Sequence, residues 1–208
     1  MSDYSIYIML FISYVIGSIP SAVWIGKTFH GIDVREHGSG NAGATNTFRV
    51  LGKKAGTIVL CIDIVKGFLA VLPAHLIVED ISINFINYQL LLGTAAVIGH
   101  VFPLFAKFKG GKGVATLLGL MFGIHPLGSL LCLIIFLVIL ITSKYVSLSS
   151  MIGCCSFPFM MFFWFKETDN FLPYFGIIVS VLLIVTHKKN IKRLLAGNEN
   201  KTFLFGKF

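Results

Sequence analysis

Four short polar stretches interrupt a chain that is otherwise rich in apolar residues. They read HGSGNAGATNTFR at 37–49, KGGKG at 109–113, SKYVSLSS at 143–150 and HKKNIKR at 187–193. Each combines glycines or hydrogen-bonding side chains with at least one cationic residue, a composition typical of sites that bind phosphate or carboxylate groups. We therefore expect the four stretches to form the walls of one anion-binding active site.

The first stretch has the composition of a loop that leads into a helix. Gly40 and Gly43 allow a close approach of the backbone to a ligand. Thr45 or Asn46 is a plausible N-cap, and Arg49 follows one turn later. A helix N-terminus beside a guanidinium group suits a phosphate, although a flexible membrane loop is the alternative. The candidate binding residues are Ser39, Asn41, Gly43, Thr45, Asn46 and Arg49.

The second stretch stands directly before an apolar segment. Gly110, Gly111 and Gly113 flank Lys112 and predict a second glycine-lined anion site. It is not a nucleotide-binding P-loop, because Gly113 occupies the position after the lysine that serine or threonine takes in that motif. A basic loop that only orients the chain in a membrane is the alternative.

The other two stretches lie at the ends of apolar segments. Ser147, Ser149 and Ser150 begin one segment, where hydroxyl groups cap a helix or bind an anion. His187 and Asn190 follow another segment with i, i+3 spacing, so they share one face of a helix. From these stretches we select Ser147 and Ser150 as binding residues, and His187 and Asn190 as catalytic candidates beside Lys112 and Arg49.

The composition is that of a membrane protein. Of the 208 residues, 56% are hydrophobic and 12% are charged, and the mean hydropathy is +0.86. We predict an all-α polytopic protein with a single membrane domain over residues 1–208. The net charge of +8 is split among loops, so it favours lipid or anionic substrates over nucleic acid. The four cysteines lack metal-ligand spacing with histidine, and no metal is expected.

The charge distribution decides the predicted topology. Apolar runs predict spans near residues 4–26, 55–78, 88–106, 146–165 and 171–186, and a run at 114–142 that GIHPLG interrupts. If the interruption is a turn, one side of the membrane holds 15 of the 17 Lys and Arg residues. We therefore predict seven transmembrane helices, the N-terminus outside and the C-terminus inside. All four polar stretches then face the cytoplasm.

The second predicted span contains charged residues of its own. Asp63 and Lys66 have i, i+3 spacing and predict an ion pair that holds the helices together, since unpaired charges are costly in a membrane. His75 and Asp80 match the H-x-x-x-x-D motif of acyl-CoA acyltransferases, but at the outer end of the span. We interpret that match as chance.

Six motifs follow one another over nearly the whole chain: GSIPSA, GSGNAGATNTFRVLGKKAG, DIVKG, GHVFPLFAKFKGGKGVAT, YVSLSS and HKKNIKRLLAGNE. Together they resemble the bacterial acyl-phosphate:glycerol-3-phosphate acyltransferase family, known as PlsY. The resemblance implies a multi-pass enzyme of the bacterial cytoplasmic (inner) membrane that works in phospholipid synthesis. Its substrates would be acyl phosphate and glycerol-3-phosphate, acylated at the 1-hydroxyl, and its products lysophosphatidic acid and phosphate. No cofactor, metal or obligate protein partner is implied.

The resemblance also carries site residues over to this chain. The positions that match the family's motifs are Ser39, Thr45, Asn46, Arg49, Gly110, Gly111, Lys112, Ser150, His187 and Asn190. Ala42 and Ser149 depart mildly from the common family pattern, in which proline, and glycine or alanine, are frequent at these positions.

The expected mechanism needs no enzyme nucleophile, because acyl phosphate is already an activated anhydride. We expect Lys112 and the glycine amides to hold the acyl phosphate, and Arg49 to orient glycerol-3-phosphate. The general base is left open between His187 and a phosphate oxygen of the substrate. A membrane carrier for phosphate esters is the alternative function, which the acidic outer loops disfavour.

Overall fold

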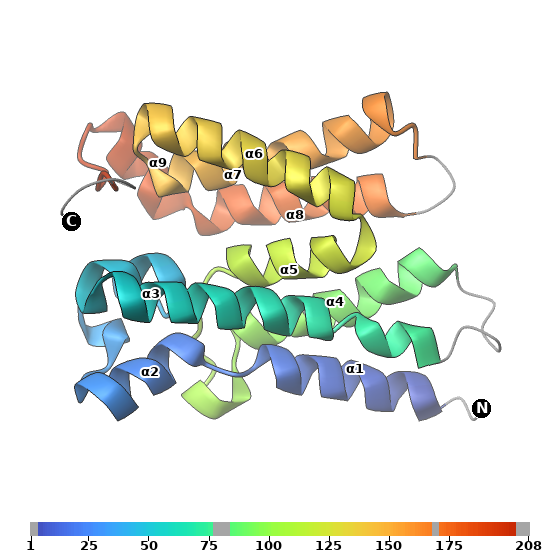
Figure 1. Ribbon diagram of the computed structural model, residues 1–208, viewed down its shortest axis with the longest axis horizontal. Coiled ribbons are helices and arrows are strands. Elements are labelled where there is room, and N and C mark those ends of the chain that lie inside the picture. Colours follow the sequence, from blue (N-terminus) through green and yellow to red (C-terminus); the bar gives the residue numbers. More distant parts are fainter. Residues whose placement is uncertain (1–3, 77–83, 168–170, 203–208) are drawn as a thin grey trace. The chain divides into compact units, whose positions relative to one another are not determined.

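The computed structural model describes residues 4–76, 84–167 and 171–202, and all regular elements in these ranges are helices (Figure 1). The predicted all-α class is confirmed for this part of the chain. Contacts divide the chain into an N-terminal unit, residues 1–124, and a C-terminal unit, residues 125–208. Each unit is described by itself, and the single domain over 1–208 stays a prediction.

The N-terminal unit contains five α-helices and three short 3₁₀ turns in its described residues. They are α1 (Tyr4–Gly17), α2 (Ser21–His30), η1 (Val34–Glu36), α3 (Ala44–Leu69), η2 (Leu72–Leu76), α4 (Phe85–Val101), η3 (Leu104–Ala106) and α5 (Val114–Ile124). Pro20 separates α1 from α2, as a proline without a backbone N–H predicts.

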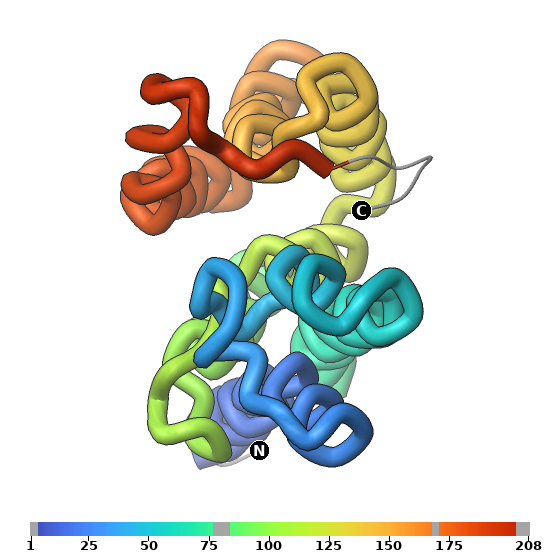
Figure 2. Tube along the Cα trace, turned by 90° about the vertical axis from the view of Figure 1, so that its left-hand side faces the viewer, coloured from blue at the N-terminus to red at the C-terminus, as the bar shows by residue number. Residues whose placement is uncertain are grey.

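Small residues let these helices approach one another closely. α1 packs mainly on α4, and α3 packs mainly on α5. A Cβ added at Gly17 would collide with the backbone of Ala96, and one at Gly67 with the carbonyl of Thr116. Such glycine contacts are typical of helices that pack inside a membrane, where close backbone approach replaces the hydrophobic effect. The helices of the unit are seen nearly end-on in Figure 2.

Helix α3 is broken near its start. Gly52 has φ 84° and ψ −176°, a conformation that only glycine adopts readily. The turn at Gly52 brings the ring of Phe48 against Gly56, where a Cβ would not fit. Residues 44–51 therefore form a short separate helix, and it carries Arg49.

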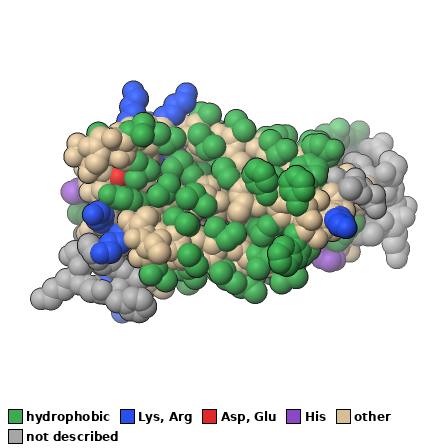
Figure 3. Space-filling model, turned by 90° about the horizontal axis from the view of Figure 1, so that it is seen from above, with side chains coloured by type: hydrophobic (Ala, Val, Ile, Leu, Met, Phe, Trp, Pro, Cys, Tyr) green, Lys and Arg blue, Asp and Glu red, His purple; other side chains and the backbone are tan. Residues whose placement is uncertain are grey.

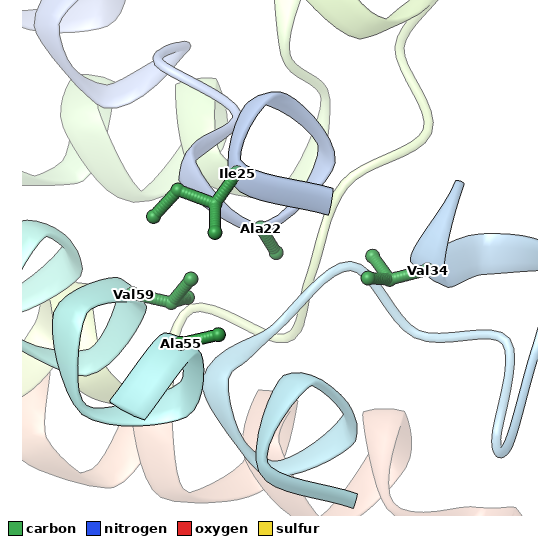
Figure 4. Close-up of a cluster of buried hydrophobic side chains, with 5 residues drawn as sticks. All are labelled: Ala22, Ile25, Val34, Ala55 and Val59. Carbon is green, nitrogen blue, oxygen red and sulfur yellow. The ribbon is translucent and has the colours of Figure 1, made fainter. Parts of the chain in front are cut away.

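A cluster of buried apolar side chains holds the first polar loop against α2 and α3. Figure 4 shows Ala22 and Ile25 of α2 facing Ala55 and Val59 of α3, with Val34 of η1 beside them. Val34 and Val59 are fully buried. The burial of the Val34 side chain in this cluster anchors the loop that follows it. The sequence around Val34 is polar and does not predict this contact.

The C-terminal unit contains α6 (Pro126–Ser143), α7 (Val146–Phe159), the π-helical turn η4 (Met160–Trp164), α8 (Leu172–Thr186) and α9 (Lys188–Leu195). α7 packs between α6 and α8. Helix α5 ends at Ile124 and α6 begins at Pro126, so the predicted break within GIHPLG is confirmed. α8 and α9 meet at an angle of 63°.

Five helical segments of the described residues are long and apolar enough to span a membrane. They are Tyr4–His30, Ala44–Leu76, Phe85–Ala106, Pro126–Ser143 and Val146–Trp164. The bent pair α8 and α9 is a sixth candidate span if the two helices cross the membrane as one. Helix α5 is a shorter apolar helix of 11 residues. The seven spans and their orientation stay predictions.

The surface agrees with a membrane protein. The face drawn in Figure 3 carries hydrophobic side chains along most of its length, whereas most of the Lys and Arg side chains visible there gather towards one end. Of the two residues of the H-x-x-x-x-D match, His75 meets the ring of Phe85 edge to face, with ring centroids 4.9 Å apart. Asp80 and the predicted end of the second span lie outside the described residues.

Candidate active site

Asn46 organises the first polar loop from the inside. Its side chain is 1% exposed. Its Oδ1 accepts hydrogen bonds from the backbone N–H of Ser39 at 2.8 Å and from the Ser39 hydroxyl at 3.1 Å. Its Nδ2 donates to the carbonyls of Val34 at 2.8 Å and His37 at 3.1 Å. These four bonds use the full capacity of the amide, so Asn46 holds Ser39 in place and commits its own amide to the loop.

The helix after this loop begins earlier than the sequence predicts. Gly43 is the N-cap of α3, and no side chain caps it. The expectation that Thr45 or Asn46 is the N-cap is wrong, because the Asn46 amide turns back to the loop. The Thr47 hydroxyl donates to the Gly43 carbonyl at 3.1 Å. The uncapped N-terminus presents backbone N–H groups, which favour a bound anion.

Arg35 lies just before the first polar stretch and bonds to the second. Its Nη1 donates to the carbonyls of Ala106 at 2.9 Å and Lys109 at 3.3 Å. Its other nitrogens grip Asp33 in a fork, with Nε to Oδ1 at 2.9 Å and Nη2 to Oδ2 at 2.7 Å. Lys27 lies 3.3 Å from the same carboxylate. The Arg35 hydrogen bonds, opposed by burial, hold the pKa of Asp33 well below its usual range.

The D-x-R spacing of Asp33 and Arg35 is visible in the sequence, but it gives no sign that the guanidinium would reach main-chain carbonyls far along the chain. The first two polar stretches lie side by side, since a Cβ added at Gly111 would lie 3.1 Å from the Ala42 carbonyl. Arg35, just before the first stretch, adds a bond to Lys109 of the second.

Residues 109–113, the glycine loop, lie against the C-terminal end of α4. The N–H of Gly110 donates to the Val101 carbonyl at 3.1 Å, and that of Gly111 to the His100 carbonyl at 3.2 Å. A Cβ at Gly110 would collide with the His100 carbonyl, and one at Gly111 with Nε2 of His100. Both glycines are therefore required for packing. The two amides that we expected to hold phosphate are hydrogen-bonded within the protein.

The two cationic site residues predicted in the N-terminal unit differ in exposure. Lys112 follows these glycines directly and is half-buried. Arg49 is exposed on the short helix before Gly52. With the amides of Gly110 and Gly111 used for packing, the candidate anion-binding groups of the two loops are these cationic side chains and the N-terminus of α3.

In the C-terminal unit, Glu199 gathers the third and fourth stretches. Its Oε1 accepts from the Ser147 hydroxyl at 2.9 Å and from Nδ2 of Asn190 at 2.7 Å. Its Oε2 lies 2.6 Å from Nε of Arg193. Burial would raise the pKa of Glu199, but the bonds from Arg193, Asn190 and Ser147 together lower it. Glu199 thus fixes two predicted site residues at once.

Glu199 was missed because Ser147, Asn190 and Arg193 come near it only after the chain has reversed behind α9. After α9 the chain reverses at Gly197, which has φ 71° and whose N–H donates to the Leu194 carbonyl at 3.1 Å. The returning segment is held where the N–H of Thr202 donates to the Lys144 carbonyl at 2.7 Å. The one available signal was an acidic residue in a basic tail.

His187 is 4% exposed at the junction of α8 and α9. Its Nδ1 lies 2.8 Å from the Leu183 carbonyl. Because a carbonyl only accepts, Nδ1 carries the proton and Nε2 is the basic nitrogen of the neutral ring. The Ser150 hydroxyl donates to the Val146 carbonyl at 2.8 Å, which leaves its oxygen as an acceptor and orients it within α7.

The predicted residues are divided between the two units. The N-terminal unit holds Ser39, Asn41, Gly43, Thr45, Asn46, Arg49, Gly110, Gly111, Lys112 and Gly113, and the C-terminal unit holds Ser147, Ser150, His187 and Asn190. Among the described residues, no three His, Cys, Asp or Glu side chains are grouped as metal ligands. The prediction that all four stretches share one site stays a prediction.

These features define an integral helical membrane protein with cation-bearing polar loops suited to phosphate groups. The family model described as glycerol-3-phosphate acyltransferase matches residues 7–197. The chain belongs to this family.

Curated relatives and solved structures agree with this assignment. The glycerol-3-phosphate acyltransferase of Chlorobaculum tepidum is 45% identical and covers 93% of this chain and 94% of its own length. That of Fusobacterium nucleatum is 44% identical and covers 94% of this chain and 97% of its own.

Two crystal structures of PlsY (YgiH), an integral membrane glycerol 3-phosphate acyltransferase, are similar to this chain. The glycerol 3-phosphate form has a TM-score of 0.85 and 36% identity, and covers 97% of this chain and all of its own. The lysophosphatidic acid form has a TM-score of 0.80 and 35% identity over 96% of both chains.

Proposed function

We propose that this protein transfers an acyl chain from acyl phosphate to the 1-hydroxyl of glycerol-3-phosphate. The products are lysophosphatidic acid and inorganic phosphate. The observation that carries the proposal is the similarity, over 97% of the chain, to a structure of PlsY in its glycerol 3-phosphate form. The second form of that enzyme, with lysophosphatidic acid, supports the product.

The proposed reaction is a direct displacement. The hydroxyl oxygen of glycerol-3-phosphate forms a bond to the acyl carbon, and the bond from that carbon to the phosphate oxygen breaks. The hydroxyl proton goes to a base, and the phosphate leaves with the electron pair of the broken bond. Because the acyl group arrives activated, the protein needs to orient two anions and stabilise the charge on the leaving phosphate.

Lys112 neutralises the phosphate that leaves, and Arg49 orients glycerol-3-phosphate. Ser39, held by Asn46, offers a hydroxyl beside Arg49's helix. This assignment differs from the sequence expectation in one respect: the amides of Gly110 and Gly111 serve packing, so we assign the charge stabilisation in the glycine loop to Lys112.

The base is either His187 or a phosphate oxygen of the substrate. The tautomer fixed by the Leu183 carbonyl makes Nε2 of His187 a competent acceptor. Substitution His187→Gln separates the two: a base role predicts a loss of about a hundredfold in kcat. A small loss with an unchanged pH profile assigns the proton to the substrate.

We further propose that the protein is a seven-span enzyme of the bacterial cytoplasmic membrane, with its active site facing the cytoplasm. Cysteine substitution followed by labelling with an impermeant thiol reagent in intact cells tests this orientation. Lys144→Cys should be protected and Lys166→Cys should be labelled. The reverse pattern would contradict the orientation.

The deciding experiment measures phosphate release by purified protein in lipid vesicles supplied with palmitoyl phosphate. Release that depends on glycerol-3-phosphate, with lysophosphatidic acid formed, is the expected result. Turnover with acyl-CoA but not with acyl phosphate would contradict the donor. If folded protein is inactive with both donors but takes up glycerol-3-phosphate in vesicles, it is a carrier and not this enzyme.

A further inference from the structure

A buried polar network lies behind the glycine loop, inside the helices of the N-terminal unit. Asp63 of α3 is its centre and is 1% exposed. Its Oδ1 accepts from the Ser21 hydroxyl at 2.8 Å and lies 2.8 Å from Nζ of Lys66. Lys66 also donates to the Ile19 carbonyl at 2.9 Å, where α1 and α2 are interrupted. The predicted Asp63–Lys66 pair is thus confirmed, and it joins α2 to α3.

His100 extends this network to α4 and α5. Its Nδ1 lies 3.7 Å from Oδ1 of Asp63. A hydrogen bond of 3.0 Å joins the same nitrogen to the hydroxyl of Thr116, which is fully buried. Two contacts on one ring edge fix the orientation of the imidazole, and His100 itself is only 6% exposed.

The other side of His100 supports the glycine loop. A Cβ added at Gly111 would collide with Nε2 of His100, and the carbonyl of His100 accepts a hydrogen bond from the Gly111 N–H at 3.2 Å. Gly110 is packed against the same carbonyl. One residue therefore meets the network through Nδ1 and meets the loop through Nε2 and its carbonyl. Lys112 is the next residue of that loop.

The energetics of the network favour a positioning role over a stabilising one. Oδ2 of Asp63 is buried and has no hydrogen-bond partner among the described residues. An unsatisfied buried oxygen costs free energy, and apolar replacement of a buried ion pair is often neutral or stabilising. This network lies directly behind a cationic loop although it lowers stability. Its presence there is therefore better explained by the conformation that it gives to the glycine loop.

We propose that His100 is a positioning residue for Lys112. Held by Thr116 and Asp63, its ring forms a fixed surface on which Gly111 packs, and its carbonyl contacts Gly110 beside it. The loop then presents the Lys112 ammonium in the position where charge develops on the leaving phosphate. The proposal rests on the proposed function for its kinetic part and makes a separate prediction about order in the loop.

Two variants test the kinetic part. His100→Leu removes the ring, and Thr116→Val removes only the hydroxyl at nearly constant volume. Each should lower kcat, about tenfold for His100→Leu and less for Thr116→Val, with KM for glycerol-3-phosphate within about twofold. His100→Gln, which keeps a polar group towards Gly111, should recover part of the loss. Ser13→Ala is the matched control: Ser13 is equally buried, donates to the Ala70 carbonyl at 2.9 Å, and should leave kcat unchanged.

A double-mutant cycle distinguishes positioning from general damage. In a Lys112→Ala background, His100→Leu should change kcat less than about twofold, because the group that it positions is already gone. A further tenfold loss in that background would overturn the proposal and make His100 a purely structural residue.

Hydrogen exchange tests the same idea without any substrate. His100→Leu should raise amide exchange in residues 107–113 and leave residues 4–17 unchanged, in protein with an unaltered melting temperature. If the wild type transfers no acyl group from any donor, the proposed function fails while the exchange result still decides the role of His100. Unchanged exchange and unchanged kcat in both His100→Leu and Thr116→Val would overturn the proposal.

Discussion

The two clusters of polar residues are built on different principles. In the N-terminal unit, side chains bond to the main chain: Asn46 to Val34 and His37, and Arg35 to Ala106. In the C-terminal unit, three side chains converge on the single carboxylate of Glu199. The first arrangement fixes the path of the backbone, whereas the second fixes side chains through one residue near the chain end. Substitutions in the N-terminal cluster should therefore deform the polar loop, whereas substitutions in the C-terminal cluster should release the segment after α9.

The largest effect should come from the cation of the glycine loop. Lys112→Ala should lower kcat for acyl transfer by about a hundredfold or more, because a charged donor at a developing anion is lost. Steady-state phosphate release in lipid vesicles measures it. Lys109→Ala is the control, since that side chain is exposed and the residue bonds through its backbone, with its N–H donating to the Ala106 carbonyl and its carbonyl accepting from Arg35. A loss below about tenfold for Lys112→Ala would contradict the role assigned to it.

The next effect should be on the stability of the N-terminal loop. Asn46→Ala leaves two carbonyls and the Ser39 amide without their partner, and should cost about 2 kcal/mol. Thermal unfolding in detergent, followed by circular dichroism, measures the loss. Thr94→Val removes only a bond of 2.7 Å within α4 to the Leu90 carbonyl, and should cost under about 0.5 kcal/mol. Equal effects would mean that Asn46 does not organise the loop.

A smaller loss should follow from opening the C-terminal cluster. Glu199→Gln keeps the shape of the side chain but weakens its bond to Arg193, and should lower kcat about three- to tenfold. Limited proteolysis should show cleavage after α9 at lower protease concentration, with the N-terminal unit unaffected. If the tail stays protected, Glu199 is not what holds it.

The smallest effect should be a pH dependence of the same tail. The pKa of Glu199 is lowered in the folded protein, so its contribution is fully present above its unfolded pKa of about 4.3 and is lost as the pH falls through the lower folded value. The protection factors for amide hydrogen exchange in residues 196–202, measured relative to the intrinsic rate at each pH, should therefore stay high near neutral pH and fall only in acid. The Glu199→Gln variant should show no such transition over the same range.

Local physics made the break between α5 and α6 readable in the sequence. Pro126 lacks a backbone N–H, and the helix break lies within GIHPLG as predicted; Pro20 lies at a similar break between α1 and α2. The i, i+3 spacing of Asp63 and Lys66 predicted a pair, which has Nζ and Oδ1 2.8 Å apart. The density of apolar residues fixed the all-helical class, because a segment in lipid must satisfy its backbone groups internally.

Composition and spacing also selected the polar stretches, and the resemblance of six motifs indicated the family. What each residue does within them depends on partners distant in the chain. Gly110 and Gly111 were expected to offer amides to phosphate, but α4 takes both amides. Asn46 was expected to bind substrate or cap a helix, but four bonds turn it into the centre of the loop.

Only the tertiary structure identified Arg35, Glu199 and His100. Each acts on groups that come near it only after helices have packed or the tail has reversed. The sequence by itself determined which segments are apolar and helical and which are polar, since these follow from local composition, and the resemblance of its motifs indicated the family. The hydrogen-bond partners were decided by packing, because donors and acceptors that are distant in the sequence come within bonding distance only in the folded chain.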